Sequence, residues 1–486
     1  MKSEFYFNIS FRISYKKFLE CAILEVMNVE ALQKEIQGKI LLDPKSLEEA
    51  SGDFGRRVFK TPACVVLPKS AQDVAAVIRF ARAAKIPIGI RGGAHTQSGQ
   101  GLSDGGILLD LKSLNQILSV DPKIEKAVVQ SGVKWKDLVG RTVPEGFIPR
   151  VLTNNLDVTI GGTLSVAGLG ISSFRYGTQG DNCLELEVVT GKGEIVRCSP
   201  DQNKELFFCS LAGFGQFAVI TEATIRLRAV PPHTRTYFLL YEGLRTLMKD
   251  AQMLMGGGER FHFLESWCVP CPQGFRKVNG IPQLFARWFY PLHATVEFDD
   301  KNLPDDEKLL TGLSFRELVH KEDRTTFEFA NRLEPLFELW KKSGYWANTH
   351  PWMETILPWE AAFPYISQVL ANFPPQALGG GHILLWPSRG TVSHVPLFKH
   401  PATEFVMGFG VLPGLPKEFL PHSLPQLNAL SDLSLRAGAK RYLSGHIEFD
   451  AARWKMHYGE TWEAMKSWKK IYDPDKILNP GFLPFE

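Results

Sequence analysis

Long apolar runs and blocks of basic residues are both missing from this sequence of 486 residues. No window of about 18 apolar residues occurs, so we expect no membrane-spanning helix. The formal net charge of +3 is close to neutral for this length. Without clustered Lys and Arg we expect no nucleic-acid partner. The chain is nevertheless long enough for two or three domains, each with its own core.

Cysteine is sparse, and its count of seven is odd. An odd number does not form a complete disulfide framework, so a reducing, cytoplasmic location fits better. Cys268 and Cys271 have the spacing of a redox or metal pair, but no second pair and no following histidine stands near them. We interpret this pair as structural or incidental, and we expect no metal site.

The first 26 residues carry scattered lysines and aromatic residues but no small-residue cleavage site, which makes them a poor signal peptide. Met27 then precedes a helix-like run over residues 29–36. One hypothesis is that translation begins at Met27. The other is that residues 1–27 form an N-terminal extension that is disordered.

A strand, a helix and a second strand follow one another early in the chain. Residues 65–68 are an apolar strand, and Ser70 with Asp73 three residues later forms a capping signature. Apolar residues at helical spacing predict an amphipathic helix over 71–84, and residues 86–90 have the pattern of the next strand. This unit is a candidate βαβ crossover, so a ligand is expected at the end of its second strand.

A glycine-rich turn stands at that position. It consists of Arg91-Gly92-Gly93-Ala94-His95-Thr96-Gln97-Ser98-Gly99-Gln100-Gly101. Glycines let the backbone approach a ligand, and successive free N–H groups form a nest that suits a pyrophosphate. The turn is not a Rossmann fingerprint, because no Gly-x-Gly-x-x-Gly leads directly into a helix, and no Gly-Lys-Ser/Thr closes it as in a P-loop. By itself it indicates an anion-binding site with His95 in its middle.

Three further motifs follow this turn in order. They are Gly161-Gly162-Thr163-Leu164-Ser165, Leu184-Glu185-Leu186-Glu187-Val188-Val189-Thr190-Gly191 and Leu211-Ala212-Gly213-Phe214-Gly215-Gln216-Phe217. Together with the turn, they resemble the vanillyl-alcohol oxidase / p-cresol methylhydroxylase superfamily of flavoproteins. Within it the chain is most similar to the cytokinin dehydrogenases and their bacterial relatives. The resemblance is strong to Leu227, loose through the middle of the chain, and clear again from about Trp454.

The resemblance implies an α+β fold, with a two-subdomain FAD-binding domain of p-cresol methylhydroxylase type and an α+β cap domain built on an antiparallel sheet. We expect residues 28–230 to form the first part of the FAD-binding domain, residues 231–440 the substrate or cap domain, and residues 441–486 a C-terminal return to the FAD-binding domain. The aromatic residues at helical spacing from Trp454 to Trp468 are expected to be core.

Within the cap, the sequence suggests both strands and helices. The candidate strands are 236–241, 260–269, 283–289, 382–386 and 405–411, and the candidate helices are 315–319 and 327–340.

The resemblance also implies an extended FAD. Its pyrophosphate would lie on the backbone N–H groups of the two glycine-rich runs, and Ile220 would line the adenine and ribityl side. The residues implied in FAD binding are Arg91, Gly92, Gly93, Ala94, His95, Thr96, Ser98, Gly99, Gln100, Gly161, Gly162, Thr163, Ser165, Gly168 and Ile220.

His95 matches the histidine that the family links covalently to its flavin. Here it stands in Ala94-His95-Thr96, where the family more often has Gly-His-Ser. The alternative is a loop histidine that hydrogen-bonds the backbone. Some relatives carry a second, cysteinyl link just before the second glycine-rich run, but residues 152–157 hold no cysteine. We therefore expect one link at most, through His95.

The catalytic base is the least clear part of the resemblance. In the family an Asp before the second glycine-rich run takes the substrate proton, but this chain has Asn154 there, and an amide cannot act as that base. Asp157 could substitute if its strand turns it inward, and a solvated or capping Asp is equally open. His446 is either a base or flavin contact, or a buried structural histidine. The further cap candidates are Glu354, Glu265, His382 and Arg389, with Tyr442 weaker.

These residues predict an FAD-dependent oxidoreductase that transfers a hydride from a C–N or C–OH bond of a small organic substrate to flavin N5. Oxygen or a quinone-like acceptor would then reoxidise the flavin. Adenine-derived cytokinins are possible substrates, and an alcohol, a sugar or a secondary metabolite is equally open. Asn154, and Phe482 where the family tends to have Gln, motivate an alternative from another class. That alternative is a flavin-binding protein with little or no turnover that sequesters a small molecule.

Overall fold

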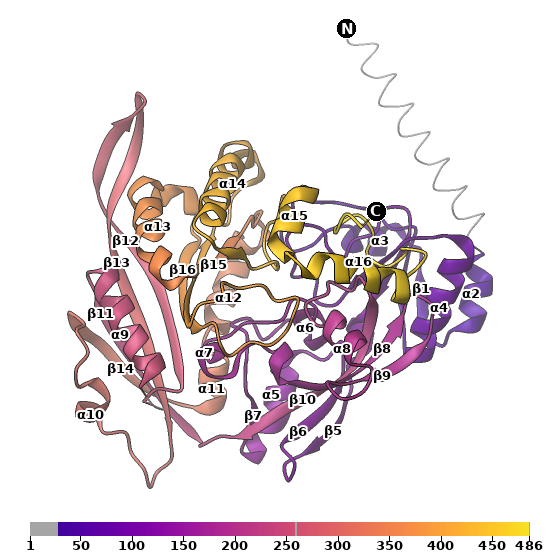
Figure 1. Cartoon of the computed structure of the whole chain (residues 1–486), viewed down its shortest axis with the longest axis horizontal. Helices are drawn as coiled ribbons and strands as arrows, with labels where there is room; N and C mark the ends of the chain where they lie inside the picture. Colours follow the sequence, from indigo (N-terminus) through magenta and orange to yellow (C-terminus); the bar gives the residue numbers. More distant parts are fainter. Residues whose placement is uncertain (1–27, 258–259, 486) are drawn as a thin grey trace.

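The computed structural model describes residues 28–257 and 260–485 (Figure 1). The hypotheses about Met27 and residues 1–27 lie outside the described residues. The described part contains three β-sheets with helices packed on them, and no helix in it is long and apolar enough to cross a membrane. The chain is therefore α+β in its content of helices and strands, as predicted.

The first sheet has four strands and contains the predicted βαβ unit. In spatial order the strands are β1 (Lys39–Leu41), β2 (Cys64–Leu67), β4 (Ile107–Asp110) and β3 (Ile88–Arg91). Strands β2 and β3 both pair with β4 in parallel, and helix α4 (Ala71–Ala84) connects β2 to β3. Helices α2 (Val29–Glu35) and α3 (Pro44–Ala50) flank this sheet. The glycine-rich turn leaves the C-terminal end of β3, where a ligand was expected.

Helix α4 begins and ends at the predicted residues. The Ser70 side chain accepts a hydrogen bond from the Asp73 backbone N–H, as in a helix N-cap. The Asp73 carboxylate does not complete a capping box with Ser70. It accepts instead from the backbone N–H groups of Gln37, Gly38 and Lys69. One carboxylate therefore caps the helix region and ties the preceding segment to it.

The second sheet lies beside the first and is antiparallel. Its strands are β5 (Ile117–Asp121), β6 (Lys126–Gln130), β10 (Ala218–Ala229), β8 (Cys183–Thr190) and β9 (Ile195–Cys198), with β7 (Phe147–Pro149) pairing on the end of β10. The helices in this part of the chain are α5 (Trp135–Thr142), α6 (Ile160–Leu164), α7 (Ser173–Tyr176) and α8 (Lys204–Ser210). The second glycine-rich run forms α6.

The third sheet is antiparallel and has eight strands. In spatial order they are β14 (Glu317–Thr325), β11 (His233–Tyr241), β13 (Ile281–Phe298), β12 (Phe263–Val278), β16 (His382–Arg389), β17 (Phe405–Leu412), β15 (Met353–Pro358) and β18 (Lys440–Arg441). Figure 1 shows this sheet at the opposite end of the molecule from β1 and α2. All five candidate cap strands lie in it, although β12 and β13 extend further than predicted.

The two faces of the third sheet have different neighbours, because successive residues of a strand point to opposite sides. Ile383 and Leu385 of β16 and Phe409 of β17 belong to a core that includes residues of α9 (Leu244–Gly256), α13 (Trp359–Asn372) and α14 (Leu420–Arg436). The alternate residues, such as Leu384, line a cavity on the other face. The helices thus cover one face of the sheet and leave the other for the site.

Two of the helix predictions in the cap are wrong, and the short strand β18 is one of two strands that were missed. Residues 315–319, predicted as a helix, lead into edge strand β14, because pairing with β11 outweighs their helical propensity. The helix predicted over 327–340 is two helices, α11 (Thr326–Ala330) and α12 (Glu334–Lys342). Pro335 lies in the first turn of α12, where the missing N–H costs nothing, and it could not continue a helix from α11. Strand β15 was not predicted.

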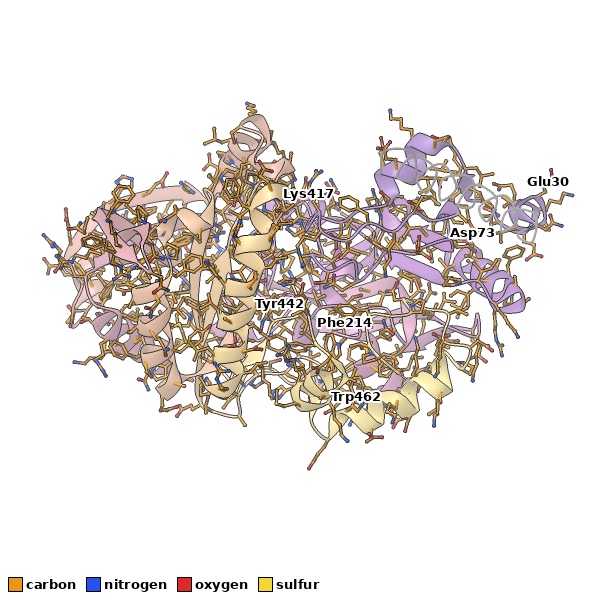
Figure 2. The ribbon with its side chains drawn as sticks, turned by 90° about the horizontal axis from the view of Figure 1, so that it is seen from above. Glu30, Asp73, Phe214, Lys417, Tyr442 and Trp462 are labelled. Carbon is orange, nitrogen blue, oxygen red and sulfur yellow. The ribbon has the colours of Figure 1, made fainter. Side chains whose placement is uncertain are left out.

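The C-terminal segment packs against the second sheet. Of the aromatic residues expected to be core, Trp454, Tyr458 and Trp462 are buried there and Trp468 is partly buried, on α15 (Ala451–Tyr458) and α16 (Thr461–Tyr472). The chain then returns to the glycine-rich turn, where the Asn479 carboxamide accepts from the Ile90 N–H at 2.7 Å and donates to the Phe214 carbonyl at 2.7 Å. In Figure 2, Phe214 and Tyr442 lie in the middle of the molecule and Asp73 and Glu30 at one end.

Candidate active site

One cavity of about 460 Å³ joins the glycine-rich turn to the open face of the third sheet. Its lining comes from the turn after β3, from the α6 region, from the start of β10 and from strands β12, β15, β16 and β17. These segments lie far apart in the sequence. The fold therefore brings the expected cofactor residues and the expected substrate residues into a single continuous space.

Most residues implied in FAD binding line this cavity. They are Arg91, Gly92, Gly93, Ala94, His95, Thr96, Gln100, Gly161, Gly162, Thr163, Ser165 and Ile220. Three do not. Ser98 turns away and accepts from the Ile447 N–H at 2.9 Å, Gly99 donates to Asp53 at 2.8 Å, and Gly168 lies against Gln179. These three residues support the turn from behind, and we correct their predicted role accordingly.

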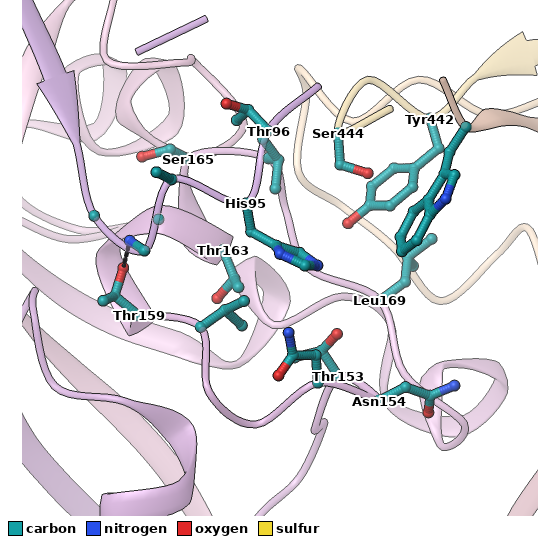
Figure 3. Close-up of a pocket in the computed structure, with 18 of the residues that line it drawn as sticks. His95, Thr96, Thr153, Asn154, Thr159, Thr163, Ser165, Leu169, Tyr442 and Ser444 are labelled. Atoms are coloured by element: carbon teal, nitrogen blue, oxygen red, sulfur yellow. Dashed lines mark hydrogen bonds between the residues drawn. The ribbon is translucent and has the colours of Figure 1, made fainter. Parts of the chain in front are cut away.

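The cavity wall fits the pyrophosphate of a dinucleotide such as FAD. Among the described residues, the backbone N–H groups of Ala94, His95 and Thr96 have no hydrogen-bond partner in the protein. The two glycine-rich runs meet closely at this wall. A Cβ on Gly92 would lie 2.0 Å from Thr159 Oγ1, and the Gly93 N–H donates to the same hydroxyl at 3.3 Å (Figure 3). Only glycine at position 92 permits this approach.

Ala94 stands in the left-handed region, with φ of 53°. A non-glycine residue there carries backbone strain, and such strain clusters at functional turns. This is the position at which the family more often has glycine.

His95 lies in the middle of the cavity wall, with Thr163 on one side and Leu169 and Tyr442 on the other (Figure 3). Burial lowers the pKa of its imidazole to about 4, with a further contribution from nearby His350. The ring is therefore neutral near pH 7 and keeps a nitrogen lone pair. Its face packs on the Phe54 ring at a centroid distance of 4.2 Å.

Asn154 lines the cavity and is held by two charged neighbours. Its amide N–H donates to Glu265 at 2.6 Å, and its amide oxygen accepts from Arg332 at 2.8 Å. Arg332 also forms an ion pair with Glu265 at 2.8 Å, and the Glu265 side chain is 4% exposed. The guanidinium neutralises Glu265, and the pair fixes the orientation of the Asn154 amide. One N–H and one lone pair of that amide remain free for a substrate.

Glu354, on β15, belongs to a second polar cluster with Ser444 and Tyr442, and all three line the cavity. The Ser444 hydroxyl donates to the Glu354 carboxylate at 3.2 Å. Burial raises the pKa of Glu354 to about 7, against the opposing effects of Ser444 and of the Arg441 charge. Among the residues that the structure describes, no cation lies within 4.0 Å of this carboxylate. Glu354 is thus poised to exchange a proton near neutral pH.

Two of the catalytic candidates are not part of the cavity lining. Asp157 forms an ion pair with Lys134 at 3.0 Å, and its side chain is 41% exposed. The pKa of Asp157 is lowered, because the Lys134 bond and charge outweigh partial burial. His446 is buried, with Nδ1 against the Arg57 guanidinium and Nε2 3.2 Å from the Asn428 side-chain oxygen. The structure places both outside the site, and we correct their predicted catalytic role.

The other cap candidates divide in the same way. Glu265, His382 and Tyr442 line the cavity, and Arg389 does not. Burial lowers the pKa of His382 to about 4, and its ring stacks on Trp340. Phe482 is partly buried and packs against Phe214 and Trp454.

Sequence reasoning missed the aromatic lining of the cap side. Six aromatic residues line the cavity there: Trp267, Phe337, Trp340, Trp346, Trp352 and Trp386. The density of Trp and Phe past residue 260 was the available signal, but nothing in the spacing shows which rings face a cavity. Among the described lining residues, Arg91 is the single Lys or Arg, and Asp110 lies 3.5 Å from it. The cap side is therefore aromatic, with acidic groups and no free cation.

Comparison with known proteins assigns the family. A family model described as "Cytokinin dehydrogenase 1, FAD and cytokinin binding" matches residues 231–485, more than half of the chain. The chain belongs to this family. A second model, described as an FAD binding domain, matches residues 62–199. The protein is thus an FAD-linked oxidoreductase of the cytokinin dehydrogenase type, and the predicted resemblance is confirmed.

Curated relatives match along almost the full length of the chain. An uncharacterized oxidoreductase from the fasciation locus of Rhodococcoides fascians is 30% identical over 441 residues, which cover 90% of this chain and 97% of the relative. Cytokinin dehydrogenase 10 of Oryza sativa subsp. japonica is 30% identical over 92% of this chain and 88% of its own. Cytokinin dehydrogenase 2 of Arabidopsis thaliana is 28% identical over 93% and 94%.

The cysteines and other metal-binding residue types were compared over the part of the chain that the structure describes. In the described ranges, no group of three or more His, Cys, Asp or Glu residues is arranged to hold a metal ion. Cys268 is buried and Cys271 exposed on strand β12, and both are free thiols. Each of the other four described cysteines is also a buried free thiol.

Proposed function

We propose that this protein oxidises a C–N or C–OH bond of a small planar organic molecule, and that Glu354 accepts the proton released in the reaction. One observation carries the proposal. The cavity runs without interruption from the glycine-rich turn to Glu354, which is the one lining carboxylate, among the described residues, that has no cation within 4.0 Å.

FAD, when bound, supplies the acceptor for the hydride that leaves the substrate carbon. The residues that would hold it are the backbone N–H groups of Ala94, His95 and Thr96 together with the glycines of α6. Gly92 and Gly162 keep this wall flat, since a Cβ at either would lie within 2.8 Å of Thr159 Oγ1. In this proposal the first two sheets would form two subdomains around the cofactor, and the third sheet would form a cap over it. Oxygen or a quinone-like acceptor would then take the electrons.

We further propose that His95 is covalently linked to the flavin. Three features support the link: the ring lines the cavity, it is neutral near pH 7, and it belongs to the turn that the FAD-binding family model covers. A covalent link retains the cofactor and raises its potential. Acid precipitation of the purified protein tests this proposal, because only linked flavin stays in the pellet.

The chain's own residues divide the work on the substrate. Asn154 offers one donor and one acceptor, and the charge of Glu265 beside it is balanced by Arg332, so this cluster orients a substrate without removing its proton. Glu354 removes the proton, and ionised Glu354 is favoured by the Ser444 hydrogen bond and the nearby Arg441 charge. The aromatic walls exclude water and bind flat rings.

Cytokinins are the first class of substrate to test, because the description of the family model that matches the cap half of the chain includes cytokinin binding. Cap-side tryptophans suit a planar heterocycle, and Asn154 and Glu354 offer polar groups for ring nitrogens or an exocyclic amine. An anionic substrate is disfavoured, since Glu354 lines the cavity without a cation beside it and Arg91, the one lining Lys or Arg among the described residues, is engaged with Asp110. Aromatic alcohols and aromatic amines are the matched comparison set.

Anaerobic mixing with this panel tests the function. The flavin absorbance of the unmutated protein is expected to bleach with at least one planar amine or alcohol. Glu354→Gln is expected to slow bleaching about 100-fold or more, as for loss of a general base, with unchanged FAD content. Asp157→Asn, an acid outside the cavity, is the matched control and should bleach at the native rate. If Glu354→Gln bleaches at the native rate, Glu354 is not the base. If no compound of the panel bleaches the flavin, the alternative holds, in which the protein binds a small molecule without turnover.

A further inference from the structure

We propose that Phe54 positions His95 for attachment to the flavin. This inference rests on the proposed covalent link and deepens it, because it names the residue that orients the attacking ring. Phe54 packs on His95 at a centroid distance of 4.2 Å and on His350 at 4.3 Å, with only 6° between the Phe54 and His350 planes. The three rings pack in a row, which we call the stack: His350 lies parallel to Phe54, and His95 packs on Phe54 with its plane tilted by 33°, on the cavity side.

The backbone fixes Phe54 in this place. The Phe54 N–H donates to the Ala94 carbonyl at 2.8 Å, and the Gly55 N–H donates to the Thr96 carbonyl at 3.1 Å. Residues 53–55 therefore run alongside residues 94–96, with Phe54 opposite His95. A Cβ on Gly55 would lie 2.5 Å from the Cα of Gln97, so only glycine allows the two segments to lie so close.

Asp53 holds the same segment from the other end. Its carboxylate accepts from the Gly99 N–H at 2.8 Å and from the Thr96 hydroxyl at 3.1 Å. Phe54 is thus tied to the glycine-rich turn on both sides. Phe54 is buried, with a 9% exposed fraction, and these contacts hold its backbone beside His95.

The cap completes the stack. The His350 N–H donates to the Gly55 carbonyl at 3.1 Å, and the Trp352 N–H donates to the Gln97 side chain at 2.9 Å. The Trp352 ring meets Phe54 edge-on at 5.2 Å and His95 edge-on at 6.0 Å. Trp346 adds a third ring, with its centroid 6.1 Å from that of His95, so aromatic rings surround His95 where it lines the cavity.

This enclosure matters for the bond that forms. Attachment joins a ring nitrogen of His95 to the carbon of a flavin methyl group; one C–H bond of that methyl breaks, and its proton and the imidazole proton leave to solvent. The two electrons of the broken C–H bond reduce the flavin, and oxygen or the quinone-like acceptor takes them. The nitrogen lone pair must point at the methyl carbon. Because the His95 ring is packed on Phe54, it has fewer orientations than a free ring, and more of its time is spent in the reactive one. Phe54 supplies that restriction and also excludes water from one face of the imidazole.

The test compares Phe54→Met, an apolar side chain of similar size without a ring, with Phe54→Tyr, which keeps the ring. Phe59→Leu is the matched control, since Phe59 is 59% exposed in the same segment. For each protein, total bound flavin is measured, and the share that stays in the pellet after acid precipitation is followed over time. Melting temperature is measured in parallel, and His350→Leu, which removes the far ring of the stack, gives a second perturbation.

The expected result is that Phe54→Met binds FAD normally but attaches it about tenfold more slowly, or incompletely. Phe54→Tyr and Phe59→Leu should attach it at the native rate, and His350→Leu should be intermediate. A Phe54→Met protein that attaches flavin at the native rate would overturn the inference while leaving the link intact. If Phe54→Met fails to fold, native attachment in His350→Leu would overturn the stack as the positioning device. A colourless pellet from unmutated protein would overturn the link itself, and the role of Phe54 with it.

Discussion

Glu354 and Asn154 face the same cavity, but only one of them can hold a proton near neutral pH. Asn154 stands where an acid was expected, and its amide is held by Glu265 and Arg332. Glu354 carries a pKa of about 7 because burial disfavours its charged form. The sequence excluded the Asn154 amide as the base, but it did not single out Glu354 from the other candidates. Their roles depend on which cation lies beside which acid. Arg332 is 67 positions from Glu265 in the sequence, and Arg441 is 87 positions from Glu354.

The raised pKa of Glu354 also predicts a change in stability. A carboxyl group that holds its proton more tightly when folded stabilises the fold below its unfolded pKa, and this contribution is lost as pH rises to the folded value. The window for Glu354 therefore runs from about 4.5 to about 7. Above pH 7, Glu354→Gln should be more stable than the native protein by roughly 1 to 3 kcal/mol. Melting temperatures at pH 5 and pH 8 check this, and an equal difference at both would contradict it.

Arg332 predicts a second change in stability. Arg332→Met leaves Glu265 buried without its cation, and breaking such a pair costs about 3 to 5 kcal/mol. Urea unfolding at pH 8 measures it. Lys134→Met, which removes the partner of exposed Asp157, is the matched control and should cost less than about 1 kcal/mol.

At the scale of elements, strands β15, β16 and β17 build the substrate side of the cavity. Trp386 pairs with Gly408, and Glu354 pairs with Gly410, so these side chains share one face of the sheet. A Cβ on Gly408 would lie 1.8 Å from Trp386 Cε2. The indole therefore lies flat on the backbone of β17, and the glycine makes room for it.

This contact predicts a change in substrate binding. Gly408→Ala pushes the Trp386 indole into the cavity and should raise KM for a planar substrate about tenfold, which corresponds to roughly 1.4 kcal/mol of binding. Bound FAD should be unchanged, because β17 lies on the cap side. Gly140→Ala, in helix α5 with its nearest neighbour at 3.9 Å, is the control and should leave KM unaltered. An unchanged KM in Gly408→Ala would show that the indole is not part of the binding surface.

Elements differed in how well they could be predicted, for physical reasons. Helix α4 has a cap at Ser70, regular apolar spacing and Lys85 in the left-handed conformation at its end, so local signals define it completely. Strand β14 has no apolar face, and only its pairing with β11 makes it a strand. Strand β15 lies between β17 and β18, and its pattern of Met353 to Pro358 was not separable from a loop.

At the scale of the whole molecule, the cofactor side was predictable and the substrate side was not. The turn after β3 and the run in α6 are short motifs whose glycines serve a local purpose, and nearly all their implied residues line the cavity. The substrate side instead combines residues from β12 to Ser444. Its composition depends on an eight-stranded sheet whose spatial order departs from chain order.

The central claim is that Glu354 accepts the substrate's proton during flavin reduction. The most direct measurement is the rate of anaerobic flavin reduction as a function of pH, in the native protein and in Glu354→Gln, with the best substrate of the panel. The native rate should rise with pH and level off above an apparent pKa near 7, where Glu354 is ionised. The slow Glu354→Gln rate should lack this step. A native profile without a step near pH 7, or the same step in Glu354→Gln, would contradict the account.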